Sequence, residues 1–342
     1  MPSAVITVRS EDFMVDEKWS ARFRTHHEIR SRGAIGNLND GVEIATQGVH
    51  TRLIAWPGNG FQTESVHVLT LAPGEESALY EYDMADEAML CFKGQGEVHL
   101  RGEWVQIEPG DIAYFPGRVP RAMRNPKGNS RDFVLVNQIC PPQFDLYEPA
   151  GYYDRRRGKM KFDAIEKARK EASLGNLPPD NELHYNDSYP AVRAWNLSVE
   201  EIRRDGALFN MYRGALFSGI DVPMVLLLWP GYGVSRCGFH YGCMPPGSEA
   251  ASHTHPVSDE CIVNWIGSGL SLISGEYIPT GPLDLVLAPC GVQHGGKIPA
   301  DAKGAAFPGG FASPPQLDLY LRTPHYKDGK YQTPAFEMLE TK

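Results

Sequence analysis

Short runs of apolar residues, separated by glycine and proline, recur along most of the chain. Phe133 to Ile139 and Met224 to Trp229 are two such runs, and the first is rich in β-branched residues. Gly-x-Gly and Pro-Gly pairs follow one another at intervals of about ten residues and supply the turns. This pattern predicts an all-β protein made of antiparallel sandwiches or barrels.

A different pattern lies in the middle of the chain. Ser198 and Glu201 have the spacing of a capping box, which predicts a short helix that ends near Arg204. Residues 176–192 are typical of a loop. Before that loop, with Gly175 as the expected C-cap, four apolar residues recur at helical spacing: Phe162, Ile165, Ala168 and Ala172.

The sequence also repeats itself at a constant offset of 173 residues. The segment WPGNG at 56–60 recurs as WPGYG at 229–233, and PPQFDLY at 141–147 recurs as PPQLDLY at 314–320. No gap is needed between these anchors, which indicates a tandem duplication. We therefore expect two barrels of the same topology, with Trp56 superposing on Trp229 and Pro116 on Pro289. The predicted units are an N-terminal barrel (1–150), a partly helical linker (151–210) and a C-terminal barrel (211–342).

Composition limits the partners and the cellular location that we expect. The net charge of −9 argues against a nucleic-acid or anionic-membrane partner. No apolar run approaches the roughly 18 residues that a membrane span needs, and Arg9 and Glu11 follow the N-terminus too closely for a signal peptide. The 6 cysteines contain no C-x-x-C pair, so we expect reduced thiols and a cytoplasmic protein.

The sharpest chemical signal lies in the second repeat. His253 and His255 are two residues apart, so on a strand both face the same side. A turn then brings in Glu260, and a Pro-x-Gly turn delivers His294. Three imidazoles and a carboxylate suit a first-row divalent ion with open positions for other ligands. The alternative is that these histidines are only buried and hydrogen-bonded.

The first repeat serves as a comparison. The equivalents of the four candidate ligands are Tyr80, Tyr82, Glu87 and Arg121, which offer no imidazole. We expect this former site to be metal-free. We also expect Arg121 to form an ion pair with Glu87, because a buried carboxylate needs a partner.

The pattern His-x-His-x4-Glu-x6-Gly, followed by Pro-x-Gly-x2-His, resembles that of the cupins. These β-barrels bind Fe(II), Mn(II), Ni(II) or Zn(II), so the resemblance implies a bicupin whose live site lies in the C-terminal barrel. The resemblance indicates the fold and the metal site more strongly than it indicates the reaction.

Within that superfamily, the chain is similar to the large subunit of the two-subunit hydroquinone 1,2-dioxygenases, and more distantly to gentisate-type dioxygenases. The likeness is carried by segments 141–150 and 255–260 and by the site in the second repeat. It implies ring cleavage by Fe(II), held by His253, His255, Glu260 and His294, in the degradation of an aromatic compound. The implied partners are a small aromatic substrate and dioxygen, with a small second subunit or further copies of this chain.

Two other functions stay open at this point. One is a non-redox metal cupin, an isomerase, lyase or decarboxylase that acts on a small hydroxy or keto acid. The other is a bicupin that binds a sugar or small molecule without turnover. Asn264 shares the inward parity of Glu260, and Gln293 adjoins His294, so either side chain is a candidate to touch a substrate or an ordinary polar residue of the barrel.

Overall fold

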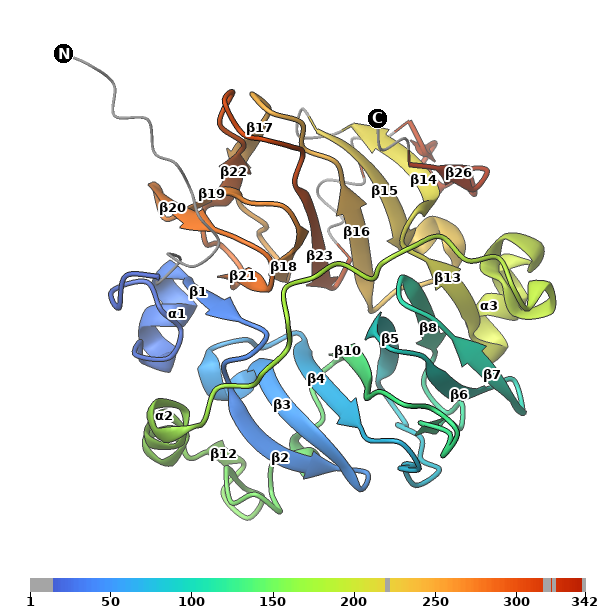
Figure 1. The fold of residues 1–342 in the computed structure, drawn as a ribbon, viewed down its shortest axis with the longest axis horizontal. Coiled ribbons are helices and arrows are strands. Elements are labelled where there is room, and N and C mark those ends of the chain that lie inside the picture. Colours follow the sequence, from blue (N-terminus) through green and yellow to red (C-terminus); the bar gives the residue numbers. More distant parts are fainter. Residues whose placement is uncertain (1–14, 219–221, 316–320, 322–323, 340–342) are drawn as a thin grey trace.

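The computed structural model describes residues 15–218, 222–315, 321 and 324–339. Two antiparallel β-barrels lie side by side, the first in blue and green and the second in yellow to red (Figure 1). The predicted all-β architecture is confirmed. In the part of the chain that the structure describes, no helix combines the length and apolar character that crossing a membrane requires.

The first repeat begins with a capped helix and continues as a series of short strands. Thr25 and Glu28 form a capping box at the helix start, and Gly33 ends the helix with a φ of 70°. The elements are α1 (His26–Arg32), β1 (Ala34–Asn37), β2 (Val42–Thr46), β3 (Val49–Ala55), β4 (Ser65–Leu71), β5 (Asp86–Lys93), β6 (Gly96–Leu100), β7 (Glu103–Ile107), β8 (Asp111–Phe115), β9 (Met123–Arg124) and β10 (Phe133–Cys140).

The second repeat reproduces these elements in the same order and adds one strand, β17, where the first repeat has only isolated bridges. Its elements are α3 (Val199–Asp205), β13 (Ala207–Asn210), β14 (Arg213–Ser218), β15 (Pro223–Leu228), β16 (Gly238–Gly242), β17 (Glu249–His253), β18 (Asp259–Ile266), β19 (Gly269–Ile273), β20 (Glu276–Thr280), β21 (Asp284–Ala288), β22 (His294–Lys297) and β23 (Phe307–Ser313). Short pairs follow in β24 (Tyr326–Lys327), β25 (Lys330–Tyr331) and β26 (Glu337–Met338).

The offset of 173 holds for these boundaries. Strands β5 to β8 and β18 to β21 start and end at equivalent positions. Trp56 and Trp229 each precede a short 3-10 helix, Pro57–Asn59 and Pro230–Tyr232. Part of the second anchor, residues 316–320, lies outside the described residues. The duplication therefore governs the fold as well as the sequence.

The repeat begins earlier than the expected boundary at 211, because α3 and β13 correspond to α1 and β1. These first strands are exchanged between the halves. Strand β1 pairs with β21 of the second barrel, while β13 pairs with β8 of the first. Asn37 donates to Asp284 across the first of these ladders (2.8 Å).

The linker between the repeats contains α2 (Phe162–Glu171) and the small pair β11 (Tyr153–Asp154) and β12 (Lys159–Met160). The helix has its C-cap at Ala172, whose ψ of 141° is extended, so the expected C-cap at Gly175 is wrong. The predicted capping box at Ser198 is confirmed, and its helix ends at Asp205.

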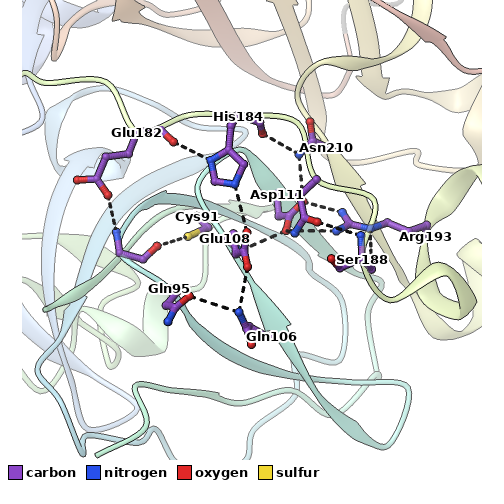
Figure 2. Close-up of polar contacts among 12 residues, drawn as sticks. Cys91, Gln95, Gln106, Glu108, Asp111, Glu182, His184, Ser188, Arg193 and Asn210 are labelled. Atoms are coloured by element: carbon purple, nitrogen blue, oxygen red, sulfur yellow. Dashed lines mark hydrogen bonds and ion pairs between the residues drawn. The ribbon is translucent and has the colours of Figure 1, made fainter. Parts of the chain in front are cut away.

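Beyond α2 the linker runs along the first barrel. Figure 2 shows His184 between the carbonyl oxygen of Glu182 and the carboxylate of Glu108, at 2.9 and 3.2 Å. Next along the chain, Arg193 forms a fully buried ion pair with Asp111 (2.6 Å). These contacts fasten the connecting segment to the barrel it leaves.

Candidate metal centre

The four predicted ligands come from neighbouring elements of the second barrel. His253 ends β17, His255 lies in the following turn, Glu260 is the second residue of β18, and His294 begins β22. His253 and His294 are direct partners across the β17–β22 ladder. The ligand atoms of all four side chains lie within 4.8 Å of one another. The structure therefore gathers the four side chains that the spacing singles out.

These side chains lie in the interior of the barrel. His255, Glu260 and His294 are each 1% exposed, and His253 is partly buried. Glu260 Oε2 lies 2.8 Å from His294 Nε2 and 3.1 Å from His255 Nε2. The imidazole nitrogens thus converge on one carboxylate oxygen.

The backbone fixes which nitrogen faces the centre. His253 Nδ1 lies 2.8 Å from the carbonyl oxygen of Ala251, and His294 Nδ1 lies 2.9 Å from that of Val292. Because a carbonyl only accepts, each Nδ1 carries the proton and donates it. Nε2 is therefore the ring nitrogen available to the cluster, which is how a metal-ligating histidine is normally oriented.

The protonation states suit a cation. Burial, followed by the charge of His294, lowers the pKa of His253 to about 4, so its imidazole is neutral at pH 7. Burial would raise the pKa of Glu260, but hydrogen bonds and charge from His255 and His294 hold it well below the usual range. No lysine or arginine lies within ion-pair distance of this carboxylate among the described residues. The donor set therefore fits a metal ion, which would supply the positive charge that the buried carboxylate otherwise lacks.

A cavity of about 80 Å³ opens onto this cluster. Its walls are mostly apolar, and the polar or charged side chains that line it are His240, His253, Glu260, Asn264, Ser271, Thr280 and Lys297. The hydroxyls of Ser271 and Thr280 are joined by a 2.7 Å hydrogen bond. Gly310 leaves room for the Glu260 side chain, since a Cβ at this position would lie 2.7 Å from Glu260 Oε1. Apolar walls with a few convergent polar groups are the usual form of a small-molecule site.

The two candidate substrate residues lie in different surroundings. Asn264 lines the cavity. Its side-chain amide makes no hydrogen bond to another side chain or backbone group in the described part of the chain. Gln293 is exposed, donates to Ser252 (2.8 Å) and does not line the cavity, which favours the alternative of an ordinary polar residue. Adjacent strand residues face opposite sides, and the inward position belongs to His294.

Sequence reasoning missed the wider lining of the cavity. His240 occupies the position of His67 in the first repeat, and its Nε2 lies 3.6 Å from Glu260 Oε1 while its side chain lines the cavity. Comparison of the repeats contains the missing signal: the first barrel has larger apolar residues where the second has Gly242, Gly296 and Ala306. Those larger residues are Leu69, Met123 and Phe133, all buried in the first core.

The equivalent positions in the first barrel form a closed polar cluster. Arg121 Nη1 lies 3.4 Å from Glu87 Oε2 with both side chains fully buried, so the expected ion pair is confirmed. The Tyr80 hydroxyl lies 3.1 Å from each Glu87 oxygen, and the ring of Tyr82 lies 5.1 Å from the guanidinium. Asn137 adds a donor (2.6 Å) that the sequence analysis did not single out.

Comparison with known proteins agrees with the fold. Residues 67–136 match the family model described as a cupin domain. The chain has the bicupin fold. No curated protein sequence matches it significantly.

Solved structures of bicupin architecture are similar over most of the chain. YlbA from E. coli shares 12% identity at a TM-score of 0.54, covering 83% of this chain and 91% of its own. A putative glyoxylate-induced protein from Pseudomonas aeruginosa shares 13% at 0.54, covering 82% and 89%. An oxalate decarboxylase from Bacillus subtilis shares 13% at 0.52, covering 85% and 81%. At these identities the likeness concerns the fold alone.

Proposed function

We propose that this bicupin is an Fe(II)-dependent dioxygenase that cleaves the ring of a hydroquinone- or gentisate-like substrate in its C-terminal barrel. The observation that carries this proposal is the cluster of three histidines and one glutamate facing an apolar cavity. The resemblance to hydroquinone dioxygenases gives the substrate class. Mn(II), Zn(II) and Ni(II) fit the same donors and are the alternatives to iron.

The chain's own residues would hold and orient the reactants. When bound, Fe(II) supplies open coordination positions and redox chemistry at which a phenolic substrate and dioxygen meet. His253, His255, Glu260 and His294 would hold it. Ile262 and Val286 line the cavity and offer apolar surface to a planar ring while keeping bulk water away.

Asn264 would orient the substrate from farther along the same strand. It lies four residues after Glu260 on β18, roughly 13 Å along the strand. Its amide can donate to a second oxygen of the substrate or accept from a second hydroxyl. This arrangement favours a substrate with polar groups at both ends of an apolar ring.

Oxygen uptake tests the proposal. The protein would be stripped of metal, reloaded with Fe(II) without air, and given hydroquinone, gentisate or catechol. The expected result is one dioxygen consumed per substrate opened, with both oxygen atoms of labelled dioxygen in the product. Zinc-loaded protein is the control and should consume none.

Two outcomes would contradict the dioxygenase. Metal-dependent turnover of a hydroxy or keto acid without oxygen uptake would identify the non-redox alternative. Binding of the diols without product under every metal would identify a binding protein.

A further inference from the structure

Asp259 joins the metal cluster of the second barrel to the first half of the chain. We infer that Arg30 and the loop at residues 61–63 are positioning elements of the metal centre, and that they act through Asp259. The first repeat would thus serve the site of the second. The inference depends on the metal cluster and not on which reaction occurs there.

The Asp259 side chain is fully buried and accepts four hydrogen bonds, three of them from the first half. Arg30 Nη1 donates to Oδ1 at 2.6 Å. The backbone amides of Gln62 and Thr63 donate to Oδ2 at 2.5 and 2.9 Å. The fourth donor is the amide of Cys290, 2.8 Å from Oδ1. The carboxylate therefore points away from the four candidate ligands, although its chain neighbour Glu260 points toward them.

The same carboxylate lies where the ligand-bearing segments meet. Asp259 precedes Glu260 directly, and its bond to Cys290 holds the turn that leads to His294. From that turn, the Gly291 amide donates to the carbonyl oxygen of His255 (2.9 Å), and Cys290 Sγ lies 2.9 Å from the carbonyl oxygen of Pro256. Movement of Asp259 would shift the segments that carry His255, Glu260 and His294 together. Partners of this kind hold the geometry of metal ligands.

Helix α1 and its neighbouring loop form the support for this contact. A Cβ on Gly60 would lie 2.8 Å from the carbonyl oxygen of His26 and 3.1 Å from the amide of Arg30, so the loop packs directly on the helix. Gly60 also has a φ of 100°, which favours glycine. Arg30 and residues 61–63 therefore reach Asp259 from one packed unit.

The first barrel offers a matched comparison at Asp86. This residue corresponds to Asp259 and is likewise held by an arginine of the opposite half, Arg236 (2.8 Å), and by the equivalent turn amide, that of Gly117 (3.0 Å). Its neighbour Glu87 belongs to the cluster that contains Arg121 in place of imidazoles. Substitution at Asp86 thus disturbs the same kind of contact away from the metal centre.

Metal titration of the full-length protein tests the inference without any turnover. Metal-free protein would be titrated with Co(II) against a competing chelator, and the visible absorption of bound Co(II) would report its coordination geometry. We expect Arg30→Met and Asp259→Asn to raise the Kd for Co(II) about 10- to 100-fold and to change that spectrum. Arg30→Lys should restore most of the affinity.

The control variant is Asp86→Asn, which should lower the melting temperature but leave the Kd within about twofold of the wild type. Wild-type affinity and spectrum in both Arg30→Met and Asp259→Asn would overturn the inference. An equal loss of affinity in Asp86→Asn would also overturn it, because the effect would then be general destabilisation. If Asp259→Asn does not fold, the partly exposed Arg30 carries the test alone. A missing dioxygenase activity would leave these results unchanged.

Discussion

A buried glutamate occupies equivalent positions in the two barrels, Glu87 and Glu260, but its surroundings differ. Glu87 contacts a guanidinium, a phenol and an amide, whereas Glu260 contacts imidazoles. A carboxylate buried without compensation is costly, so each glutamate needs a nearby positive charge. The first has it in Arg121, and the second has a donor set that fits a cation.

Truncation of Arg121 should therefore destabilise the protein without affecting the metal. Arg121→Ala leaves Glu87 buried without its cation, and we expect a loss of about 3 kcal/mol or more in the free energy of unfolding at pH 7. Urea denaturation measures this, and metal analysis of the folded fraction is the control. A loss of metal in the variant would contradict the separation between the two sites.

The effect of Arg121→Ala should also depend on pH. Burial raises the pKa of Glu87, and Arg121, Asn137 and Tyr80 oppose that rise. Since the folded pKa lies above the unfolded one, ionised Glu87 disfavours the folded state, and stability returns as pH falls through the folded pKa. Without Arg121 that pKa rises further. The difference in unfolding free energy between variant and wild type should therefore be smaller at pH 5 than at pH 7.

Removal of one imidazole should abolish metal binding in the second barrel. His294→Ala removes a buried imidazole whose Nε2 lies 2.8 Å from Glu260 Oε2. We expect the metal content to fall to near zero together with activity. Elemental analysis measures the content, and His253→Ala should behave alike. Gln293→Ala, an exposed neighbour, is the control and should keep its metal. Full occupancy in either histidine variant would show that the ligands were wrongly assigned.

Asn264 should affect the substrate and not the metal. Loss of one hydrogen bond in Asn264→Ala should raise KM for the diol about tenfold, equivalent to roughly 1.4 kcal/mol. Steady-state oxygen uptake measures KM, and the metal content should remain that of the wild type. An unchanged KM would show that the substrate lies elsewhere in the cavity.

Among secondary-structure elements, the exchanged strands β1 and β13 tie the two barrels together. Each ends in an asparagine that donates to a buried aspartate of the other barrel: Asn37 to Asp284 (2.8 Å) and Asn210 to Asp111 (3.1 Å). The two bonds are equivalent by the repeat. Asp111 also forms an ion pair with Arg193. Burial raises the pKa of Asp284, and the hydrogen bonds from Gly281 and Asn37 only partly offset this rise.

These asparagines should therefore contribute unequally to stability. Asn37→Ala removes a side-chain donor from a buried carboxylate and should cost about 1–3 kcal/mol. Asn210→Ala should cost less, because Arg193 still pairs with Asp111. Urea denaturation of the two variants side by side gives the comparison, and equal losses would show that Arg193 does not compensate.

At the scale of the molecule, strand exchange predicts that neither half folds independently. Each barrel's sheet is completed by a strand from the other repeat, and one buried core includes residues of both halves. Residues 1–176 and 177–342 expressed as separate chains should therefore co-purify, while either alone should lack a cooperative thermal transition. The intact chain should unfold in one step. An isolated 177–342 that folds and binds metal would contradict this expectation.

The sequence by itself predicted the repeat, the β architecture and the grouping of His253, His255, Glu260 and His294. The physical reason is that these features depend on spacing along the chain, and a constant offset of 173 carries one barrel's register onto the other. His255 reaches the cluster from the turn after β17 and not from the strand on which the sequence had placed it. The Glu87–Arg121 pair was predictable on the same basis, because a buried carboxylate requires a partner.

Only the tertiary structure decided which distant segments meet. The sequence carries no signal that β1 joins the second barrel, because a strand's own pattern does not identify its partner. The choice between the two readings of Gln293 also needed the structure, because the pairing of β22 turns His294 inward and leaves its neighbour Gln293 exposed. The contacts of Asp259 with Arg30 and residues 62–63 span about two hundred positions, and the packing of α1 and its neighbouring loop against the second barrel brings them together.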